Sequence, residues 1–498
     1  MERKWWTLLA VCVATFMLLV DVTIVNVALP SIQRDLGASL TNLQWVVDAY
    51  ALMLAALMLT AGSLADRLGR KRVFQVGVTV FTIASLLCGL APDSTLLDLA
   101  RGLQGIGGAA MFATSLALIA QEFRGRQFGT AIAAWGSTVG AAVAVGPLIG
   151  GALTEGLGWE WIFFVNVPVG AVALALAVLR MREFRERESR GVDPGGLVTA
   201  SGASFLLVFG LLRGNAEGWG STVIVAVLAG AAVLFAAFLA IERGQPRPML
   251  DLSLFRRPAF VGVSLGTVAI GAGMFAMFFY LSLYLQNVLG YAPLQAGLRF
   301  LPLTLLVFFI PAATRTLAER VPPRAMLGSG LAIVSLGLFL MHGIDVASGG
   351  TTLLAGLIVA GVGIGLSNPA IGSIALGVVE PARSGMASGV SNTCRLGGVA
   401  IGVAALGAVF QHRIDTKLAE LAPNAPSGLA ETVASGGSRA VADPHLADAA
   451  RQAFIAGLNE ILLVGATTLL LGALASFALI RARDFARARR PAPATAEA

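Results

Sequence analysis

Carboxylates inside long apolar runs are the residues of this sequence whose setting most suggests chemistry. Asp21 lies in the stretch LVDVTIVNVALP, near the end of an apolar run that begins at Trp5. A charge near the centre of a membrane span costs about 2.5–3.5 kcal/mol on insertion scales, so such residues are rare and usually functional. At 1.5 Å per residue Asp21 lies about 24 Å along a helical span, in its outer half, where so short a side chain reaches water poorly. Asp21 is therefore a candidate proton or cation site.

Other polar residues occupy similar settings. Asp48, in WVVDAY, is interpreted either as a second proton-coupling residue or as a solvated helix cap. Arg101, in RGLQGIGGA, falls in or near the outer half of the fourth apolar run. We expect it to face the bundle interior and a partner, with Gln104 on the same helical side; the alternative is snorkelling to the outer interface. Asn26 and Asn166 are interpreted as interhelical hydrogen-bond partners.

Residue types that other functions need are scarce. The three lysines lie outside any GxxxxGK[ST] loop, so the sequence offers no P-loop for ATP. The three histidines lack metal-ligand spacing, and the three cysteines lie within apolar runs, so we expect neither a metal site nor a disulfide framework. Without a clustered acid, base or metal constellation, we expect no enzyme and no cofactor.

The composition defines the elements that must position these residues. Of the 498 residues 56% are hydrophobic and 13% are charged, against roughly 25% charged in a soluble domain. Apolar runs of about 18 or more residues recur, each long enough to cross a hydrocarbon core about 30 Å thick as a helix, and the alternation of a β-barrel is missing. We therefore predict an all-α polytopic membrane protein, with its first run as an uncleaved helix. The fourteen expected spans are 5–29, 43–65, 73–91, 95–120, 127–153, 160–180, 195–213, 221–241, 259–285, 295–316, 324–343, 352–378, 386–411 and 455–480.

Charge placement orients these spans. With the N-terminus in the cytoplasm, most of the 35 basic residues fall in cytoplasmic segments such as DRLGRKR and RMREFRERESR. This follows the positive-inside rule, so we expect a multi-pass protein of the inner (plasma) membrane with both termini cytoplasmic. The net charge of +7 comes from basic residues that are scattered among short cytoplasmic loops, so we expect no nucleic-acid partner.

Internal repetition divides the spans into halves. LADRLGRKR from Leu64 returns as LAERVPPRA from Leu317, an offset of 253 residues, and QRDLG returns as QNVLG at the same offset. Two such halves place a substrate site at their interface near mid-membrane. The repeat equivalent of Asp21 is Met274, so the fold does not require the carboxylate. The expected units are an N-terminal six-helix half over 1–190, an inserted helix pair over 191–250, a C-terminal six-helix half over 251–482 with an outer linker over 411–454, and a tail over 483–498.

A second candidate constellation lies between the second and third spans, in GSLADRLGRKR. A glycine there permits close helix packing, and Asp66 can pair with a nearby arginine or bond a helix N-terminus. This predicts a breakable latch between conformations, although a simple topogenic turn has a similar composition. The candidate latch residues are Gly62, Asp66, Arg67, Gly69 and Arg70. The counterpart in the second half is Glu319, in a degenerate copy.

The fifth span carries the motif VGPLIGG, with Gly146, Pro147, Gly150 and Gly151. Proline removes a helical hydrogen bond, and the flanking glycines allow the kinked helix to pack tightly. Ordinary glycine-rich packing is the alternative. The second half lacks this proline, which favours a role specific to the fifth span.

Together these motifs resemble a known family. GSLADRLGRKR, RGLQGIGGA, VGPLIGG, VDVTIVNVALP and WEWIFFVNVPVG are similar to the signatures of the fourteen-span drug:proton antiporters of the major facilitator superfamily. The resemblance implies export of hydrophobic compounds driven by inward proton movement, with Arg101 involved in proton coupling and VGPLIGG sealing a leak path between the halves. It implies small hydrophobic substrates, protons and membrane lipid as partners, and we expect a monomer. A non-coupled facilitator or importer and a lipid flippase are the alternatives.

The sequence gives weaker evidence for substrate-binding residues. Aromatic residues of the ninth span could form a wall for hydrophobic ligands, although such residues more often face lipid or form core. Polar residues of the thirteenth span, in SNTCRLGG, add hydrogen-bonding groups. The candidates are Gln104, Phe275, Phe279, Tyr280, Asn392 and Arg395.

Overall fold

The structure is a computed structural model of the chain. It describes residues 2–38, 40–123, 126–183, 193–245, 250–314, 320–379, 384–426, 428–436, 441 and 443–481. Within these ranges the regular elements are helices and no strand occurs. Helices satisfy their backbone hydrogen bonds within one segment, which is what a hydrocarbon environment demands.

The N-terminal half begins the chain. Its helices are α1 (Arg3–Leu36), α2 (Leu40–Leu68), α3 (Arg70–Gly89), α4 (Ser94–Glu122), α5 (Arg126–Gly156), α6 (Trp161–Phe164) and α7 (Asn166–Arg180). Short polar side chains begin several helices: the Asp93 carboxylate accepts a hydrogen bond from the backbone N–H of Leu96 at the start of α4. Gly37 ends α1 with φ 59°, a left-handed conformation that glycine adopts without strain.

The inserted pair and the C-terminal half follow. The pair is α8 (Pro194–Glu217) and α9 (Thr222–Gly244). The remaining elements are η1 (Leu252–Arg256), α10 (Pro258–Ile270), η2 (Gly271–Phe275), α11 (Ala276–Leu283), η3 (Tyr284–Val288), α12 (Pro293–Ala313), α14 (Pro323–Met341), α15 (Leu354–Gly377), α16 (Ser384–Leu421), α17 (Leu429–Gly436) and α18 (Pro444–Leu479).

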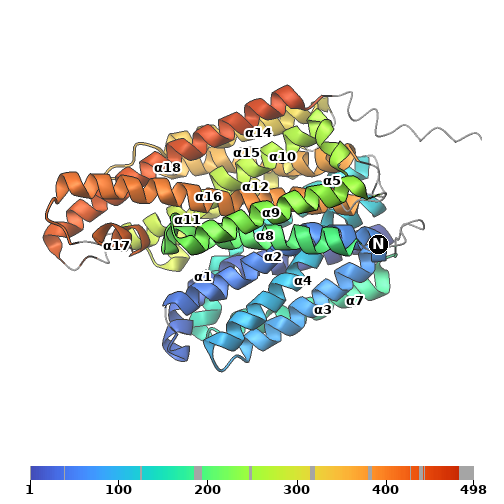
Figure 1. Ribbon diagram of the computed structural model, residues 1–498, viewed down its shortest axis with the longest axis horizontal. Coiled ribbons are helices and arrows are strands. Elements are labelled where there is room, and N and C mark those ends of the chain that lie inside the picture. The colour runs from blue at the N-terminus through green and yellow to red at the C-terminus, as the bar shows by residue number, and fades with distance from the viewer. Residues whose placement is uncertain are drawn as a thin grey trace, which may run out of the picture.

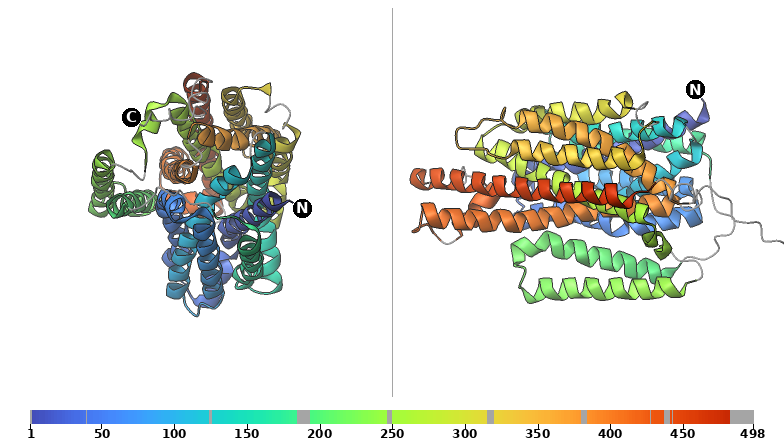
Figure 2. Two further views of the ribbon diagram at one scale, coloured as in Figure 1. Left: turned by 90° about the vertical axis from the view of Figure 1, so that its right-hand side faces the viewer. Right: turned by 90° about the horizontal axis from the view of Figure 1, so that it is seen from above.

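The long helices run side by side along the longest axis of the molecule (Figure 1). The helices of the N-terminal half gather on one side and those of the C-terminal half on the other. The pair α8 and α9 stands at the flank of the bundle in both views of Figure 2. It contacts α2, where the hydroxyl groups of Thr60 and Ser201 lie 2.7 Å apart and the rings of Trp45 and Phe209 are 6.0 Å apart.

The membrane-spanning character predicted from composition is confirmed. Thirteen helical segments of the described chain are long and apolar enough to cross a membrane. The 31-residue α5 packs among them against α1 and α12, where the fifth span was expected. The chain is a multi-pass membrane protein.

Two expected elements differ in detail. The span 160–180 is divided into α6 and α7. The span 259–285 is one helix, α10 to η3, with π-helical turns at η2 and η3, and Met274 lies in the first of these turns. Such π-turns are frequent at functional sites.

The prediction of a linker over 411–454 was wrong for much of that segment. Helix α16 continues to Leu421, α17 occupies Leu429–Gly436, and α18 already begins at Pro444. The physical reason is a repeated apolar stripe, in which Ile414, Leu418 and Val433 are buried although polar residues separate them. Their burial makes this segment a helical extension at one end of the bundle (Figure 1).

The two halves touch through small residues. A Cβ atom on Gly389 of α16 would lie 3.5 Å from the Cα of Gly62 on α2. A Cβ atom on Gly140 of α5 would overlap the side chain of Val307 on α12. Because these crossings involve glycines, the halves can approach closely at both places.

Candidate functional site

A fully buried carboxylate is the centre of the site in the N-terminal half. The side chain of Asp21 on α1 has no exposed surface. Nη1 of Arg101 donates to its Oδ2 at 2.5 Å. Nε2 of Gln104 and Nδ2 of Asn166 donate to its Oδ1 at 2.9 and 3.0 Å. Helices α1, α4 and α7 therefore meet at one carboxylate.

A second layer holds the guanidinium of Arg101. Its Nε donates to the backbone oxygen of Val46 on α2 at 2.9 Å, and its Nη1 also donates to Oε1 of Gln104 at 2.7 Å. The ring of Tyr50 lies beneath the guanidinium, 4.2 Å from Cζ to the ring centroid, within the range of a cation–π interaction. The guanidinium thus keeps three contacts besides Asp21.

Asn166 connects the carboxylate to α3. Its Nδ2 donates to Oγ of Ser85 at 3.0 Å, and that hydroxyl donates to the backbone oxygen of Phe163 at 2.9 Å. These side chains are 0–3% exposed. We name the group of Asp21, Ser85, Arg101, Gln104 and Asn166 the carboxylate cluster.

Burial makes the charge state of this cluster decisive for packing. A buried ion pair is held by its hydrogen bonds, and removing one partner typically costs about 3–5 kcal/mol because the other charge is left without compensation. A proton added to Asp21 would remove the ionic part of the attraction between α1 and α4. The arrangement can therefore convert a protonation event into a change of helix contacts.

The cluster bears on several predictions. Arg101 was expected to find a partner inside the bundle, and that partner is Asp21. Gln104 was assigned to substrate binding, whereas the structure engages its amide with Asp21 and Arg101. Asp48 is only partly buried, and within the described part of the chain no hydrogen bond or ion pair joins it to the cluster. The side chain of Asn26 lies outside the described residues.

The sequence analysis missed Ser85 and Tyr50 and underestimated Asn166. The signal for Asn166 was an amide in the apolar run WIFFVNVPVG, which was interpreted as general interhelical bonding. Ser85 carried no signal, because an isolated serine in a span usually bonds its own helix backbone. The spatial meeting of α3 and α7 gives both residues their place in the cluster.

The glycine motif of α5 packs directly beside Asp21. A Cβ atom on Gly146 would overlap the hydroxyl of Thr23, and one on Gly150 would lie 3.0 Å from the backbone oxygen of Ile24. Both contacts involve the turn of α1 that follows Asp21. Gly151 has open space where its Cβ would lie. Pro147 belongs to α5, and its side chain lies outside the described residues.

The predicted latch connects the two halves. Oδ1 of Asp66, near the end of α2, accepts from Nε of Arg70 at 2.9 Å. Its Oδ2 accepts from the backbone N–H of Met386 at 2.9 Å. Met386 is the third residue of α16, so this N–H has no partner within its own helix, and the positive end of the helix dipole favours the carboxylate. Gly62 lies at the same crossing of α2 and α16.

A second carboxylate caps the neighbouring helix, and the sequence analysis missed it. Oε1 and Oε2 of Glu183 accept from the backbone N–H groups of Lys71 and Arg72, at 3.1 and 3.2 Å, in the first turn of α3. Gly69 precedes this turn with φ 110°, and a Cβ there would overlap the Glu183 carboxylate. Arg67 lies in the last turn of α2. Glu319, the expected counterpart of Asp66, lies outside the described residues.

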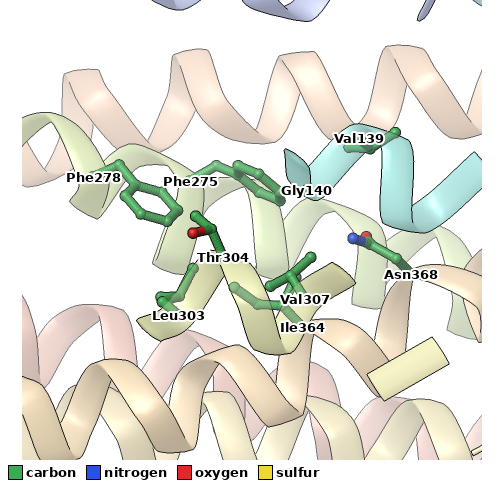
Figure 3. Close-up of a pocket in the computed structure, with 9 residues that line it drawn as sticks. All are labelled: Val139, Gly140, Phe275, Phe278, Leu303, Thr304, Val307, Ile364 and Asn368. Carbon is green, nitrogen blue, oxygen red and sulfur yellow. The ribbon is translucent and has the colours of Figure 1, made fainter. Parts of the chain in front are cut away.

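A narrow cavity lies between the halves near mid-membrane (Figure 3). Helix α5 contributes Val139 and Gly140, and the C-terminal half contributes the other lining residues. These are Phe275, Phe278, Leu303, Thr304, Val307, Ile364 and Asn368. The cavity is mostly apolar, and the Asn368 amide is its strongest hydrogen-bonding group.

The predicted substrate residues are dispersed around this cavity. Phe275 lines it. Phe279 is 53% exposed and does not line it, because it lies on the outward face of α11. The hydroxyl of Tyr280 donates to the backbone oxygen of Val403 at 2.8 Å, and Nδ2 of Asn392 donates to the backbone oxygen of Phe112 at 3.3 Å. Arg395 is 7% exposed, with its Cζ 6.0 Å from the ring centroid of Phe275.

Comparison with known proteins gives consistent matches. The sequence profile of the Major Facilitator Superfamily matches residues 11–403. The tetracenomycin C resistance and export protein of Streptomyces glaucescens is 35% identical over 419 residues, which cover 83% of this chain and 77% of that protein. The multidrug efflux pump LfrA of Mycolicibacterium smegmatis is 32% identical over 487 residues, 95% of each chain. The solved structure of a human organic anion transporter aligns with 94% of this chain and all of its own, with a TM-score of 0.64; at 14% identity this likeness concerns the fold alone.

Proposed function

Because the chain belongs to the major facilitator superfamily, and is thus a membrane transporter rather than an enzyme, we propose that it is a proton-coupled exporter of hydrophobic compounds. Relatives named for drug resistance and export support the direction of transport. Proton movement into the cell would drive the compound outward as the two halves alternate in exposing the site between them.

The carboxylate cluster is the observation that carries this proposal. When a proton binds Asp21, the carboxylate becomes a neutral carboxyl and its ionic attraction to Arg101 ends. The guanidinium keeps the Val46 carbonyl, the Gln104 side-chain oxygen and the Tyr50 ring as contacts. A neutral Asp21 can therefore persist without leaving Arg101 isolated, which a reversible proton carrier requires.

Helix contacts connect the protonation site at Asp21 with the other half of the transporter. Asp21 lies one turn before the α1 surface that packs against Gly146 and Gly150 of α5. Helix α5 in turn packs on α12 of the C-terminal half, where Gly140 meets Val307. We assign to this path the coupling of proton binding to rearrangement of the interface and of the cavity beside it.

The latch would hold one end of the interface closed. Asp66, which accepts the hydrogen bond from the start of α16, belongs to α2. The same helix supplies the Val46 carbonyl to Arg101. These two positions lie about 30 Å apart along the helix. In the proposed cycle the cluster loosens near the outer end while the latch keeps the cytoplasmic end closed, and the latch breaks when the cavity opens inward. Both termini are placed in the cytoplasm in this proposal.

The proposal is tested by dye-triggered proton flux. Wild-type protein and Asp21→Asn are reconstituted in liposomes under a pH gradient, and proton movement is recorded when a lipophilic dye is added, either the cationic ethidium or the anionic 4-(1-pyrenyl)butanoate. Asp35→Asn is the matched control, because Asp35 is an exposed carboxylate on the same helix. We expect flux with the wild type and with Asp35→Asn, and its loss in Asp21→Asn.

Two results would count against the proposal. Undiminished flux in Asp21→Asn would remove Asp21 from the coupling mechanism. Dye movement down its own gradient without proton flux in the wild type would favour a non-coupled facilitator.

A further inference from the structure

Arg395 is a buried cation with no counter-charge among the residues that the structure describes. It lies eleven residues after the start of α16 at Ser384, about 16 Å along the helix and thus near mid-membrane. Its side chain is buried, and its Nε and Nη1 have no hydrogen-bond partner in the described part of the chain. No ion pair in the described part of the chain involves Arg395. A guanidinium in this position is expensive to keep unless something pairs with it.

Asn368 has the same unusual property from a different helix. The residue is 1% exposed, and both its amide nitrogen and its amide oxygen lack a hydrogen-bond partner in the described chain. The amide belongs to the lining of the mid-membrane cavity (Figure 3). Buried amides are nearly always hydrogen-bonded. Nδ2 and Oδ1 of Asn368 can therefore bond another molecule that enters the cavity.

Phe275 connects the two groups. Its ring lines the cavity together with Asn368, and the guanidinium of Arg395 lies 6.0 Å from the ring centroid. The π-helical turn η2, which ends at Phe275, places this residue beside α16; a Cβ on Gly271 of the same turn would lie 2.5 Å from the backbone oxygen of Arg395. The Asn368 amide and the Phe275 ring therefore line one cavity, and the Arg395 guanidinium lies beside that ring, outside the cavity lining.

The two buried or half-buried carboxylates of the cluster and the latch do not fill this role. Asp21 is bonded by three donors in the N-terminal half, and Asp66 is bonded to Arg70 and to the start of α16. Within the described residues the Arg395 charge is thus left without compensation. A ligand that brings a negative charge would supply it.

We propose that the mid-membrane cavity selects compounds that carry an anionic oxygen, such as a carboxylate, sulfonate or phenolate, on a flat apolar body. Arg395 donates to the anionic oxygen from Nε and Nη1, Asn368 bonds a neighbouring polar group, and the ligand ring packs against Phe275 and Phe278. This inference rests on the proposed export function and names its substrate class. The cavity would widen to admit such a ligand when the halves move apart.

The test uses two probes that share one ring system and differ in charge. 4-(1-Pyrenyl)butanoate carries a carboxylate, and 4-(1-pyrenyl)butyltrimethylammonium carries a quaternary ammonium group. Binding to detergent-solubilised protein is followed by energy transfer from tryptophan to pyrene. Export is followed in liposomes, where proton flux is recorded with each probe.

Three variants isolate the charge of Arg395. Arg395→Met removes it, Arg395→Lys keeps it, and Arg299→Met removes an arginine of the same half whose Nη1 already bonds the Gln295 backbone oxygen. We expect Arg395→Met to weaken binding of the anionic probe about a hundredfold, the effect of losing two charge-assisted hydrogen bonds at about tenfold each, and to leave the cationic probe unaffected. Arg395→Lys retains most of the preference, and Arg299→Met retains all of it. The thermal unfolding midpoint of Arg395→Met should be no lower than that of the wild type, because the charge it removes has no protein partner.

The outcomes separate this inference from the proposed function. Equal binding of the anionic probe by the wild type and Arg395→Met overturns the inference, as does a wild type that binds only the cationic probe. Proton flux with the cationic but not the anionic probe leaves proton-coupled export standing and removes the anion site. Arg395-dependent binding of the anion without any proton flux supports the anion site and removes the coupling.

Discussion

Removal of one partner of the Asp21–Arg101 pair is predicted to destabilise the protein more than removal of both. Asp21→Asn leaves a buried guanidinium without its counter-charge, and Arg101→Gln leaves a buried carboxylate in the same state. The double variant places two neutral amides in contact. Because amides can still bond each other, the large cost should appear in each single variant and disappear in the double variant.

The surrounding contacts set the size of these effects. Breaking a buried pair costs about 3–5 kcal/mol, whereas replacing both charges by neutral groups is often close to neutral. Arg101 keeps Val46, Gln104 and Tyr50 as contacts, and Asp21 keeps two amide donors, so each single variant should lie near the lower limit, about 3 kcal/mol. With a double variant at about 1 kcal/mol, the coupling free energy is about 5 kcal/mol.

The assay is unfolding by sodium dodecyl sulfate in mixed micelles, followed by the loss of tryptophan fluorescence. A parallel cycle on Arg213 and Glu217, a partly exposed pair on α8 with 3.0 Å between Nε and Oε1, is the control. Its coupling free energy should be about 0.3–0.5 kcal/mol, as for solvent-exposed pairs one helical turn apart. Additive effects at Asp21 and Arg101, within about 0.5 kcal/mol, would refute the claim that the two charges hold each other in the bundle.

Three further predictions address the latch, the glycine motif and the cavity. Asp66→Ala removes the cap from α16 and should shift the population toward the inward-open state about tenfold. The shift is measured as spin-label distances across the cytoplasmic end. Glu183→Gln is the control and should shift the population little, because Glu183 caps α3 within one half. Gly146→Ala should lower stability by about 1–3 kcal/mol and reduce dye export, whereas Gly151→Ala, whose Cβ meets open space, should do neither; equal effects would exclude close α1–α5 packing as the cause. Phe279→Ala should leave dye affinity unchanged in a binding titration, because that side chain is largely exposed.

Much of the architecture could be predicted because a membrane restricts what a chain can do. Long apolar runs can cross only as helices, so the all-helical fold and the approximate positions of the spans followed from hydropathy. A buried arginine needs a partner, which made the setting of Arg101 predictable. The contacts of Asp66 could also be predicted. It follows a glycine at the end of a span and was expected to pair with a nearby arginine or to bond a helix N-terminus.

Other features depended on distances in space that no local pattern encodes. Gln104 was placed with the substrate because its position one turn from Arg101 suited either role, and the approach of α1 decides between them. Phe275 and Phe279 differ by four residues in one aromatic run, yet only Phe275 lines the cavity, whereas Phe279 is 53% exposed. The segment 411–454 was interpreted as a linker because it is rich in Ala, Gly, Ser and Pro, and the packing of α16 against α18 accompanies its helical structure.

Proton release on ligand binding tests the central claim most directly. Ethidium, which is cationic, and in a separate run the anionic 4-(1-pyrenyl)butanoate are added to wild-type protein and to Asp21→Asn in weakly buffered detergent solution, and the pH is recorded with an indicator dye. If Asp21 gives up its proton when a compound binds, the wild type releases protons in proportion to the bound dye and Asp21→Asn releases none, although it still binds. Equal proton release from both proteins would contradict the assignment of coupling to the carboxylate cluster.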